Sequence, residues 1–445
     1  MDTKKDNKIK TIEEYITKCE SLSHDGRGIA RINGKIAFID NALPNEEIQF
    51  TYTKHHNKYD EGIATKIITP SPDRVQPQCQ YSSICGGCNQ QHIAHHLQLK
   101  IKQNTVLEQL QHFGNIQPES ILPPLTGPIF GYRHKARLSV KYVLKKNKIL
   151  VGFHEKNGRY IADIDSCAIL HPSVGIIIKQ LSNLIATLKS YQHIPQIEIA
   201  VSHDTTALSF RNLENLCAED ENKIKNFAQQ YNFYIYLQPS NVNHLQLLYP
   251  EPSSIPNYLT YQIPQHQIEL LFLPTDFTQI NYSINLQMIN LAIQLLEPNK
   301  QDHILDLFCG LGNFTLPIAR QCHSITAIEG NQALIDHANN NALYNNITNT
   351  KFYCADLSKP LPSNFDYHEY NKILLDPPRT GALEIVTNIN KFNAKQIVYI
   401  SCNPATLARD SKILNTADYT LKTLGIIDMF PHTKHIETIA LFVLK

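Results

Sequence analysis

The stretch Leu305-Asp-Leu-Phe-Cys-Gly-Leu-Gly-Asn-Phe314 decides how the carboxyl-terminal part of this chain folds. Its apolar beginning has no helical period and predicts a strand over residues 303–308, whereas the residues after the glycines predict a helix over 313–320. The two glycines let the backbone turn tightly and approach a ligand closely. Because Thr315 stands where a third glycine would complete a dinucleotide fingerprint, the stretch alone is weak evidence for a nucleotide site.

Strands and helices alternate around this stretch, from about residue 276 to residue 445. Such alternation is typical of a doubly wound sheet, so we assign residues 276–445 to a Rossmann-like α/β domain. The strands that we expect in it are 303–308, 324–329, 351–354, 372–376 and 397–400, followed by a closing hairpin of 421–427 and 437–444.

Acidic residues stand at the ends of three successive strands of this domain. They are Glu329, Asp356 and Asp376. A carboxylate at the end of the second strand can accept hydrogen bonds from both ribose hydroxyls of a nucleoside. The series suits a nucleoside cofactor that carries positive rather than phosphate charge, and S-adenosylmethionine is the obvious candidate. Helix-capping carboxylates would explain each residue separately, but not the series.

A cysteine closes another buried strand of the same domain. In Gln396-Ile-Val-Tyr-Ile-Ser-Cys402 the apolar run predicts a central parallel strand, and Asn403-Pro404 ends it. Cys402 therefore lies at the carboxyl edge of the sheet, where open α/β sheets bind their ligands. A thiol at that edge suggests covalent catalysis, because the thiolate is the strongest nucleophile among side chains at neutral pH. The alternative is a buried structural cysteine.

The amino-terminal part of the chain has a different pattern. Residues 1–69 alternate five short β-like runs with Asn and Gly turns, which is typical of a small OB-type barrel. Its basic side chains suggest RNA binding, although the barrel could merely pack on its neighbour. A proline-containing linker begins at residue 70, and we expect residues 70–275 to form a central α+β domain.

Composition limits the cellular setting. The chain has 445 residues, 42% of them hydrophobic, and a formal net charge of +1. RNA binding must therefore come from local patches rather than from a basic whole. The charged amino terminus lacks a signal-peptide core, and no stretch approaches the roughly 20 apolar residues of a membrane span. We expect a cytoplasmic protein, in which the ten cysteines are thiols or metal ligands rather than disulfides.

Three cysteines lie close together in the pattern Cys79-x5-Cys85-x2-Cys88. A closed metal site needs a fourth ligand from elsewhere in the chain. The spacing alone suits an iron–sulfur cluster or a four-cysteine zinc site about equally.

The motifs together resemble those of the RNA uracil-C5 methyltransferases. The matching segments, in order, are Asp276–Asn281, Leu305–Phe314, Asp376–Arg379, Ser401–Asp410 and His435–Glu437. The resemblance covers the whole chain. It implies that the amino-terminal barrel is a TRAM domain, and that Cys167 completes a [4Fe–4S] site like that of the branch that modifies 23S ribosomal RNA.

The resemblance also implies a role for each site residue. Cys402 would add to C6 of a flipped uridine, Glu437 would remove the C5 proton, and Asp376 would hydrogen-bond the uracil edge or the groups around the thiolate. The cofactor contacts implied for S-adenosylmethionine are Gln279, Phe308, Asn313, Glu329, Asp356 and Asp376. We interpret His432 and His435 as surface or RNA-contacting residues.

Three cations beside Tyr132 are further candidates for RNA contact. Arg133, Lys135 and Arg137 can hold phosphates while the aromatic ring stacks a base, although solvated charges on a hairpin edge would look the same. The sequence thus predicts a methyltransferase acting on a loop or single-stranded uridine of 23S ribosomal RNA. A transfer-RNA uracil methyltransferase and a non-catalytic RNA-binding assembly factor are the alternatives.

Overall fold

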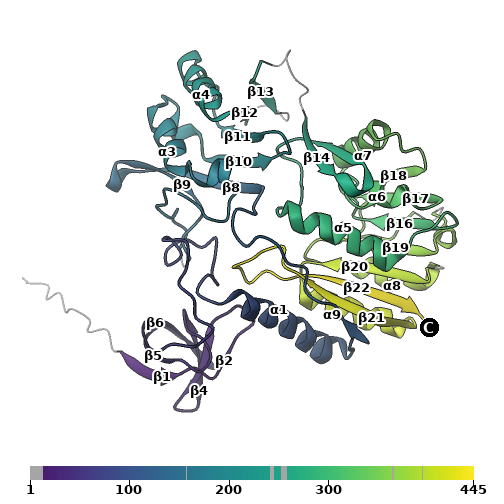
Figure 1. Ribbon diagram of the computed structural model, residues 1–445, viewed down its shortest axis with the longest axis horizontal. Helices are drawn as coiled ribbons and strands as arrows, with labels where there is room; N and C mark the ends of the chain where they lie inside the picture. Colours follow the sequence, from purple (N-terminus) through teal and green to yellow (C-terminus); the bar gives the residue numbers. More distant parts are fainter. Residues whose placement is uncertain (1–13, 157, 241–244, 252–257, 363–364, 393) are drawn as a thin grey trace, which may run out of the picture.

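The computed structural model describes residues 14–156, 158–240, 245–251, 258–362, 365–392 and 394–445. The described residues form three large sheets (Figure 1), namely an amino-terminal sheet, a central sheet and a carboxyl-terminal sheet flanked by helices, together with one two-stranded sheet. No helix among the described residues is both long enough and apolar enough to span a membrane.

The carboxyl-terminal sheet has eight strands in the order β18-β17-β16-β19-β20-β22-β21-β7. The first five are parallel, and β22 runs antiparallel between β20 and β21. The strands are β16 His303–Leu307, β17 Ser324–Glu329, β18 Thr350–Cys354, β19 Lys372–Leu375, β20 Gln396–Ser401, β21 Tyr419–Ile427 and β22 Glu437–Leu444, with β7 Ser120–Ile121 at the edge. The expected α/β fold of this part is confirmed.

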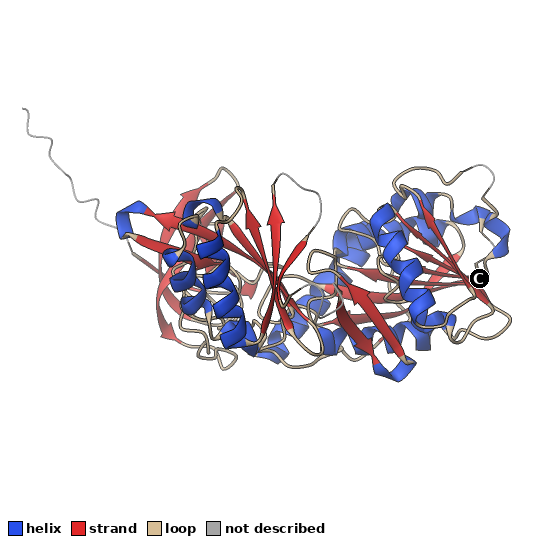
Figure 2. Cartoon of the chain, turned by 90° about the horizontal axis from the view of Figure 1, so that it is seen from above, coloured by secondary structure: helices blue, strands red, loops and turns tan. Residues whose placement is uncertain are grey.

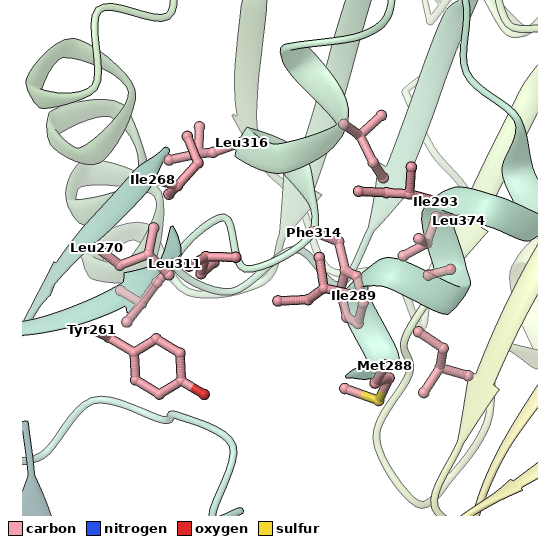
Figure 3. Packing of buried hydrophobic residues seen from close by; sticks show 14 of the residues in the cluster. Tyr261, Ile268, Leu270, Met288, Ile289, Ile293, Leu311, Phe314, Leu316 and Leu374 are labelled. Atoms are coloured by element: carbon pink, nitrogen blue, oxygen red, sulfur yellow. The ribbon is translucent and has the colours of Figure 1, made fainter. Parts of the chain in front are cut away.

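Helices cover both faces of this sheet, as Figure 2 shows. They are α1 His95–Gln109, continued by the π turn η1 Leu110–Gly114, and α5 Tyr282–Leu296, α6 Thr315–Ala319, α7 Gln332–Tyr344, α8 Leu383–Thr387 and α9 Pro404–Thr416. Strand residues alternate between two cores. Ile304 and Leu374 pack with α5 in the core of Figure 3, whereas Leu305 and Ile373 pack on the opposite face with α1, α8 and α9. Burial on both faces explains why these strands read as continuous apolar runs.

The central sheet has the order β13-β12-β11-β10-β8-β9. Its strands are β8 Lys135–Val143, β9 Lys148–Gly152, β10 Gln196–Val201, β11 Thr206–Asn212, β12 Phe233–Pro239 and β13 Gln246–Tyr249. The helices α2 Pro172–Gly175, α3 Ile178–Thr187 and α4 Ala218–Tyr231 accompany it, and α3 and α4 share its core.

The amino-terminal sheet has six strands in the order β1-β5-β6-β4-β3-β2. They are β1 Tyr15–Lys18, β2 Ser21–Leu22, β3 Gly28–Ile32, β4 Lys35–Asp40, β5 Glu47–His55 and β6 Tyr59–Thr69. Five were expected, and the additional strand β2 is only two residues long. The start of the first expected strand, residues 12–13, lies outside the described residues.

Several segments between residues 70 and 275 pack on the carboxyl-terminal sheet or on its helices. Strand β7 pairs with β21, and α1 contacts α9. The hairpin of β14 Leu259–Ile263 and β15 Ile268–Phe272 shares a core with α5. These long-range contacts have no signal in the local sequence pattern, so the predicted boundaries at residues 69 and 275 stay predictions.

Candidate catalytic site and cofactor pocket

Cys402 lies just past the carboxyl end of β20, at the start of α9. The side chain of Asn403 caps this helix by accepting a hydrogen bond from the backbone N–H of Ala405 at 3.1 Å, and Pro404 occupies its first turn. Proline there has no N–H to lose, so strand and helix are joined by a tight turn. The turn leaves the Cys402 thiol half-buried at the sheet's edge.

Glu437 begins the neighbouring strand, β22. Because Ser401 pairs with Thr438 in the antiparallel register, the next positions along the two strands, Cys402 and Glu437, lie beside each other. The Thr438 hydroxyl also donates a hydrogen bond to the carbonyl of Ser401 at 3.2 Å. Glu437 is 5% exposed, so its carboxyl group is buried.

Asp376 completes a group of three ionisable side chains at this edge. It follows β19, and its N–H donates to the carbonyl of Leu307 at 3.3 Å. Pro377 and Pro378 then turn the chain away from the sheet. The charge of Asp376 is felt by both Cys402 and Glu437, which shows that strands β19, β20 and β22 bring the three groups together.

Burial raises the pKa of all three groups. Desolvation raises the pKa of Cys402 to about 11, with smaller contributions from Glu437 and Asp376. Desolvation and the nearby Asp306 raise the pKa of Asp376 to about 7. The pKa of Glu437 is also raised well above its ordinary value, mainly by desolvation. The free thiol is therefore protonated at neutral pH, and its reaction requires a proton acceptor.

Arg379 supplies the positive charge nearest this group. It lowers the pKa of Cys402 and of Glu437, opposing the effect of burial. Its guanidinium lies 3.2 Å from Nδ1 of His435, on the loop before β22. His432 on the same loop is 4% exposed, so its interpretation as a surface residue is wrong: the loop folds inward at this point.

A pocket of about 480 Å³ opens beside Asp376. Of the predicted cofactor contacts, Gln279, Phe308, Asn313 and Asp376 line it. Phe308, Gly310 and Gly312 have φ values of 68°, 54° and 92°, so the backbone between β16 and α6 follows a left-handed path that glycine favours. This path carries the glycine turn around the pocket.

The pocket also has walls that sequence reasoning missed. Tyr261 and Leu270 come from the β14–β15 hairpin, and Phe277 is a 66% exposed ring at the pocket's edge. Asn313 is held by a reciprocal amide pair with the fully buried Asn285, at 2.8 and 3.0 Å. The Asn285 amide also donates to the Tyr261 hydroxyl at 2.8 Å. An Asn in the first turn of an apolar helix was the available signal, since such a residue needs a partner when it is buried.

The two remaining cofactor candidates lie outside this lining. Glu329, at the end of β17, accepts a hydrogen bond from the N–H of Gly310 at 3.3 Å, so it contacts the glycine turn. Asp356 is 52% exposed, and its carboxylate accepts from the N–H of Ser358 at 3.1 Å and pairs with Lys359 at 3.0 Å. The structure thus brings Glu329 to the pocket's edge and leaves Asp356 in solvent.

The four predicted metal ligands line one cavity of about 330 Å³, although they come from two distant segments. Cys79, Cys85 and Cys88 lie on one wall, and Cys167 faces them from the loop before α2. Burial raises the pKa of Cys88 to about 12 and that of Cys167 to about 11. Among the described residues, no three His, Cys, Asp or Glu side chains are grouped closely enough to hold a single metal ion.

The three candidate RNA contacts differ in exposure. The Lys135 ammonium donates to the carbonyls of Pro274 and Asp276, which leaves it little freedom to bind phosphate. Arg137 is 68% exposed and pairs with Glu198 at 2.8 Å. The Arg133 guanidinium lies 5.8 Å from the ring centre of Phe153, beside the cysteine-lined cavity.

The architecture of a parallel sheet with a glycine turn and a pocket at its carboxyl edge is that of the α/β methyltransferases. The Pyrococcus abyssi tRNA (uracil-54, C5)-methyltransferase, solved in complex with S-adenosyl-L-homocysteine, shares this fold. It superposes with a TM-score of 0.72 at 23% identity, covering 96% of this chain and 100% of that chain.

Sequence comparison shows to which family of methyltransferases the chain belongs. The family described as tRNA (Uracil-5-)-methyltransferase matches residues 96–445. The 23S rRNA (uracil(1939)-C(5))-methyltransferase RlmD of Francisella tularensis subsp. novicida is 49% identical over 443 residues, which cover 98% of both chains. RlmD of Alcanivorax borkumensis is 47% identical over 424 residues, or 95% of both chains. The chain belongs to the RNA uracil-C5 methyltransferase family, which confirms the resemblance found in its motifs.

Proposed function

We propose that this chain transfers a methyl group from S-adenosylmethionine to C5 of a uridine in 23S ribosomal RNA. The observation that carries the proposal is the meeting of Cys402, Glu437 and Asp376 at one sheet edge, beside a pocket of about 480 Å³. Relatives that cover 95–98% of this chain act on uracil 1939 of that RNA, and the same uridine is the proposed target here.

The pocket suits S-adenosylmethionine, which would supply the electrophilic methyl group. Gln279, Phe308 and Asn313 would hold it against the glycine turn, and Glu329 is placed to accept hydrogen bonds from the ribose. The complex of the Pyrococcus abyssi enzyme with S-adenosyl-L-homocysteine supports a nucleoside cofactor for this fold.

The chemistry begins with the Cys402 thiol. Uracil C5 is too weak a nucleophile to attack a methyl donor unaided. When the thiol proton passes to a carboxylate and sulfur bonds to C6, the displaced electron pair forms an enolate with density at C5. Asp376 is the better first acceptor, because its pKa of about 7 makes it partly ionised at neutral pH.

The second half of the reaction belongs to Glu437. Once C5 carries the methyl group, Glu437 removes the remaining C5 proton, the electron pair re-forms the C5–C6 double bond, and the sulfur leaves C6. Only the ionised carboxylate accepts this proton, and Arg379, which lowers the pKa of Glu437 against the effect of burial, favours that form. Target uridines in folded RNA must leave their base stack to reach this edge, so base flipping is part of the proposal.

We also propose that Cys79, Cys85, Cys88 and Cys167 hold a [4Fe–4S] cluster. A single zinc ion requires four sulfur atoms at about 2.3 Å from one point. Among the described residues no three such side chains are grouped that closely, and the four thiols instead line one shared cavity, which favours a larger group. Backbone N–H groups of Ile169 and Leu170 point at the Cys167 sulfur, and that of Gly87 at the Cys85 sulfur, where they would stabilise thiolate charge. With four cysteine ligands the cluster is closed, so its role is structural or RNA-positioning.

The amino-terminal sheet is the proposed TRAM-type RNA-binding domain. Its surface carries Arg27 over the Phe38 ring at 4.8 Å and His56 stacked on Tyr59 at 4.3 Å. Cations beside aromatic rings are the usual means of holding single-stranded RNA. Arg137 and Arg133 would extend this surface towards the catalytic edge.

A transfer-RNA substrate is the second candidate, because the names of the matching family and of the superposed Pyrococcus abyssi enzyme both specify tRNA. The deciding experiment is transfer of labelled methyl from S-adenosylmethionine to 23S ribosomal RNA and to transfer RNA, with the modified nucleotide mapped. Label in 5-methyluridine of 23S ribosomal RNA alone supports the proposal. Label in transfer RNA, or no transfer at all, would contradict it in favour of the tRNA enzyme or of a non-catalytic assembly factor.

A further inference from the structure

The loop of residues 428–436 joins β21 to β22 and ends at Glu437. Ile427 and Glu437 form the last pair of the β21–β22 ladder, so both ends of the loop are fixed at the catalytic edge. The loop also carries His435, which contacts Arg379 at 3.2 Å. Any displacement of the loop would therefore be transmitted to the proposed proton acceptor and to the cation beside it.

A buried ion pair ties the first residue of this loop to α1. The Lys102 ammonium contacts Asp428 Oδ1 at 2.8 Å, and each side chain is 1% exposed. The same ammonium donates to the carbonyl of Phe430 at 3.0 Å. His95, about two helical turns earlier, contacts the other Asp428 oxygen at 2.7 Å. Lysine is almost never buried to this degree unless its charge is paired.

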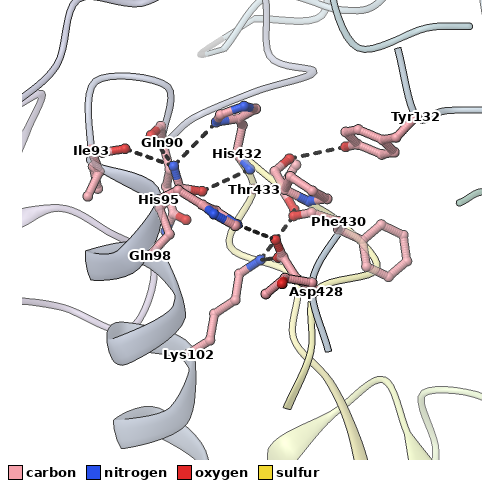
Figure 4. A network of polar contacts seen from close by, with 12 residues as sticks. Gln90, Ile93, His95, Gln98, Lys102, Tyr132, Asp428, Phe430, His432 and Thr433 are labelled. Carbon is pink, nitrogen blue, oxygen red and sulfur yellow. Dashed lines mark hydrogen bonds and ion pairs between the residues drawn. The ribbon is translucent and has the colours of Figure 1, made fainter. Parts of the chain in front are cut away.

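The middle of the loop is held from the same side (Figure 4). The Gln98 side chain, which is fully buried, accepts a hydrogen bond from the N–H of His432 at 2.9 Å. The N–H groups of Asn89 and Gln90 both donate to the His432 carbonyl at 3.0 Å. The Tyr132 hydroxyl donates to the carbonyl of Pro431 at 3.1 Å. His432 itself adopts a φ of 64°, which is uncommon for a residue other than glycine.

Apart from the ion pairs to the Asp428 carboxylate, the contacts described above hold backbone atoms of the loop. Lys102, Gln98 and the Asn89–Gln90 segment bind main-chain groups of Phe430 and His432, and Asn89 directly follows the cavity residue Cys88. A contact to the main chain fixes the path of a loop whatever its side chains do. The cysteine-bearing segment and α1 therefore form one wall against which the loop is set.

We propose that Lys102, together with Gln98 and Asp428, is a positioning residue that sets the 428–436 loop and thereby places Glu437 for removal of the C5 proton. The inference rests on the proposed function, since it assigns these residues to the step performed by Glu437. None of them contacts the pocket. They act through the main chain of the loop.

The test replaces Lys102 and compares it with a matched control. Lys372 has the same kind of partners, a carboxylate of Asp302 at 3.0 Å and the carbonyl of Glu297 at 2.6 Å, but it lies at the opposite end of the sheet from the catalytic edge. Lys102→Met should lower kcat about tenfold to a hundredfold, because small misplacements of a catalytic group have effects of that size. Lys372→Met should lower the melting temperature similarly, with kcat within about twofold of wild type.

Two further readouts separate positioning from simple loss of stability. Lys102→Met should bind S-adenosylmethionine normally and should increase the fraction of enzyme held as a methylated RNA adduct, because only the last proton transfer is slowed. The double variant Lys102→Met, Asp428→Asn also removes the buried carboxylate that has lost its lysine partner and should regain stability. Its kcat should nevertheless stay low, since the Phe430 carbonyl still lacks its donor. If Lys102→Met does not fold, this double variant serves as the test.

The outcomes are decisive in each direction. Wild-type kcat in Lys102→Met, or recovery of kcat together with stability in the double variant, would overturn the positioning role. If Glu437→Gln itself accumulates no adduct, the proposed function has failed instead. If Glu437→Gln accumulates adduct and Lys102→Met does not, only the positioning inference has failed.

Discussion

Cys402 and the four cysteines of the cavity differ in what surrounds them. At the catalytic edge, the Cys402 thiol has two carboxyls and Arg379 as neighbours. In the cysteine-lined cavity, the Cys88 thiol has mainly other thiols and the Gln91 side chain. Burial raises the thiol pKa in both places, to about 11 for Cys402 and about 12 for Cys88.

The difference shows that burial alone does not decide what a cysteine can do. At the catalytic edge a thiol proton has acceptors nearby, so the sulfur can ionise at the moment of attack. In the cavity no carboxylate lines the wall among the described residues, so loss of four thiol protons needs a bound cation to stabilise the thiolates. One environment favours transient ionisation and the other favours permanent metal ligation.

The largest effect is expected at the catalytic edge itself. Cys402→Ala should abolish methyl transfer and any covalent RNA adduct, because no enolate can form without the thiol. The side chain is half-buried and small, so the free energy of unfolding should change by about 1 kcal/mol or less. Methyl transfer from labelled S-adenosylmethionine and a denaturing gel measure the two outcomes. Substantial turnover would place the nucleophile elsewhere.

Glu437→Gln should separate the two halves of the reaction. Addition and methylation precede proton removal, so this variant should accumulate a methylated protein–RNA adduct while turnover falls by a factor of about 10² to 10⁴, the range for loss of a general base. A 5-fluorouridine substrate should trap the wild-type enzyme in the same way, because fluorine cannot leave as a proton does. Normal turnover without adduct would make Asp376 the first alternative base.

Substitutions in the cysteine-lined cavity should affect metal content and solubility rather than the covalent chemistry. Anaerobically purified protein should be brown, with about four irons per chain. Cys85→Ser should lose iron and solubility, because metal binding contributes free energy to folding. Adduct formation by whatever fraction stays folded should persist, since Cys402 is untouched. Metal analysis is the measurement, and stoichiometric zinc without iron would exclude the cluster.

Several features of the catalytic edge could be predicted from the sequence. The apolar runs predict where the strands lie along the chain. The Asn-Pro and Pro-Pro pairs that interrupt these runs predict that Cys402 and Asp376 lie at strand ends. Those signals are local, because proline cannot continue a ladder. That Cys402 and Glu437 act at one site was implied by the family resemblance alone. The β20–β22 register gives the physical reason why the two residues lie side by side.

Other parts depend on contacts between distant segments. Local periodicity gives no sign that Tyr261 and Leu270 form walls of the pocket. It gives no sign either that the loop folds inward at His432. Lys102 looks like an exposed cation of a polar helix in the sequence, yet it is 1% exposed, because its partner Asp428 lies 326 residues further along the chain.

The pH dependence of methylation should follow Asp376. Only its ionised form accepts the thiol proton, so kcat/KM should rise about tenfold per pH unit up to the pKa of about 7 and then level off. The effect on stability has the opposite sign. A carboxyl whose folded pKa is raised from 3.8 to about 7 stabilises the fold at low pH, and that contribution is lost as pH rises through about 7. Rate profiles and urea unfolding between pH 5 and 8 check both trends, and a rate that is flat across this range would exclude Asp376 as the acceptor.

The smallest effect is expected at Asp356, the candidate that the structure leaves in solvent. Its hydrogen bonds from Ser358, and then Lys359, lower its pKa to about 2, so the carboxylate is satisfied by its own turn rather than by a ligand. Asp356→Asn should therefore change the affinity for S-adenosylmethionine by less than about twofold, as expected for an exposed ion pair. Glu329→Gln is the matched comparison, because Glu329 contacts the glycine turn through the N–H of Gly310 at 3.3 Å. It should weaken binding about tenfold, the usual effect of losing a charged hydrogen bond. Equilibrium titration of both variants measures the difference, and a larger loss in Asp356→Asn would mean that the β18 end closes over the bound cofactor.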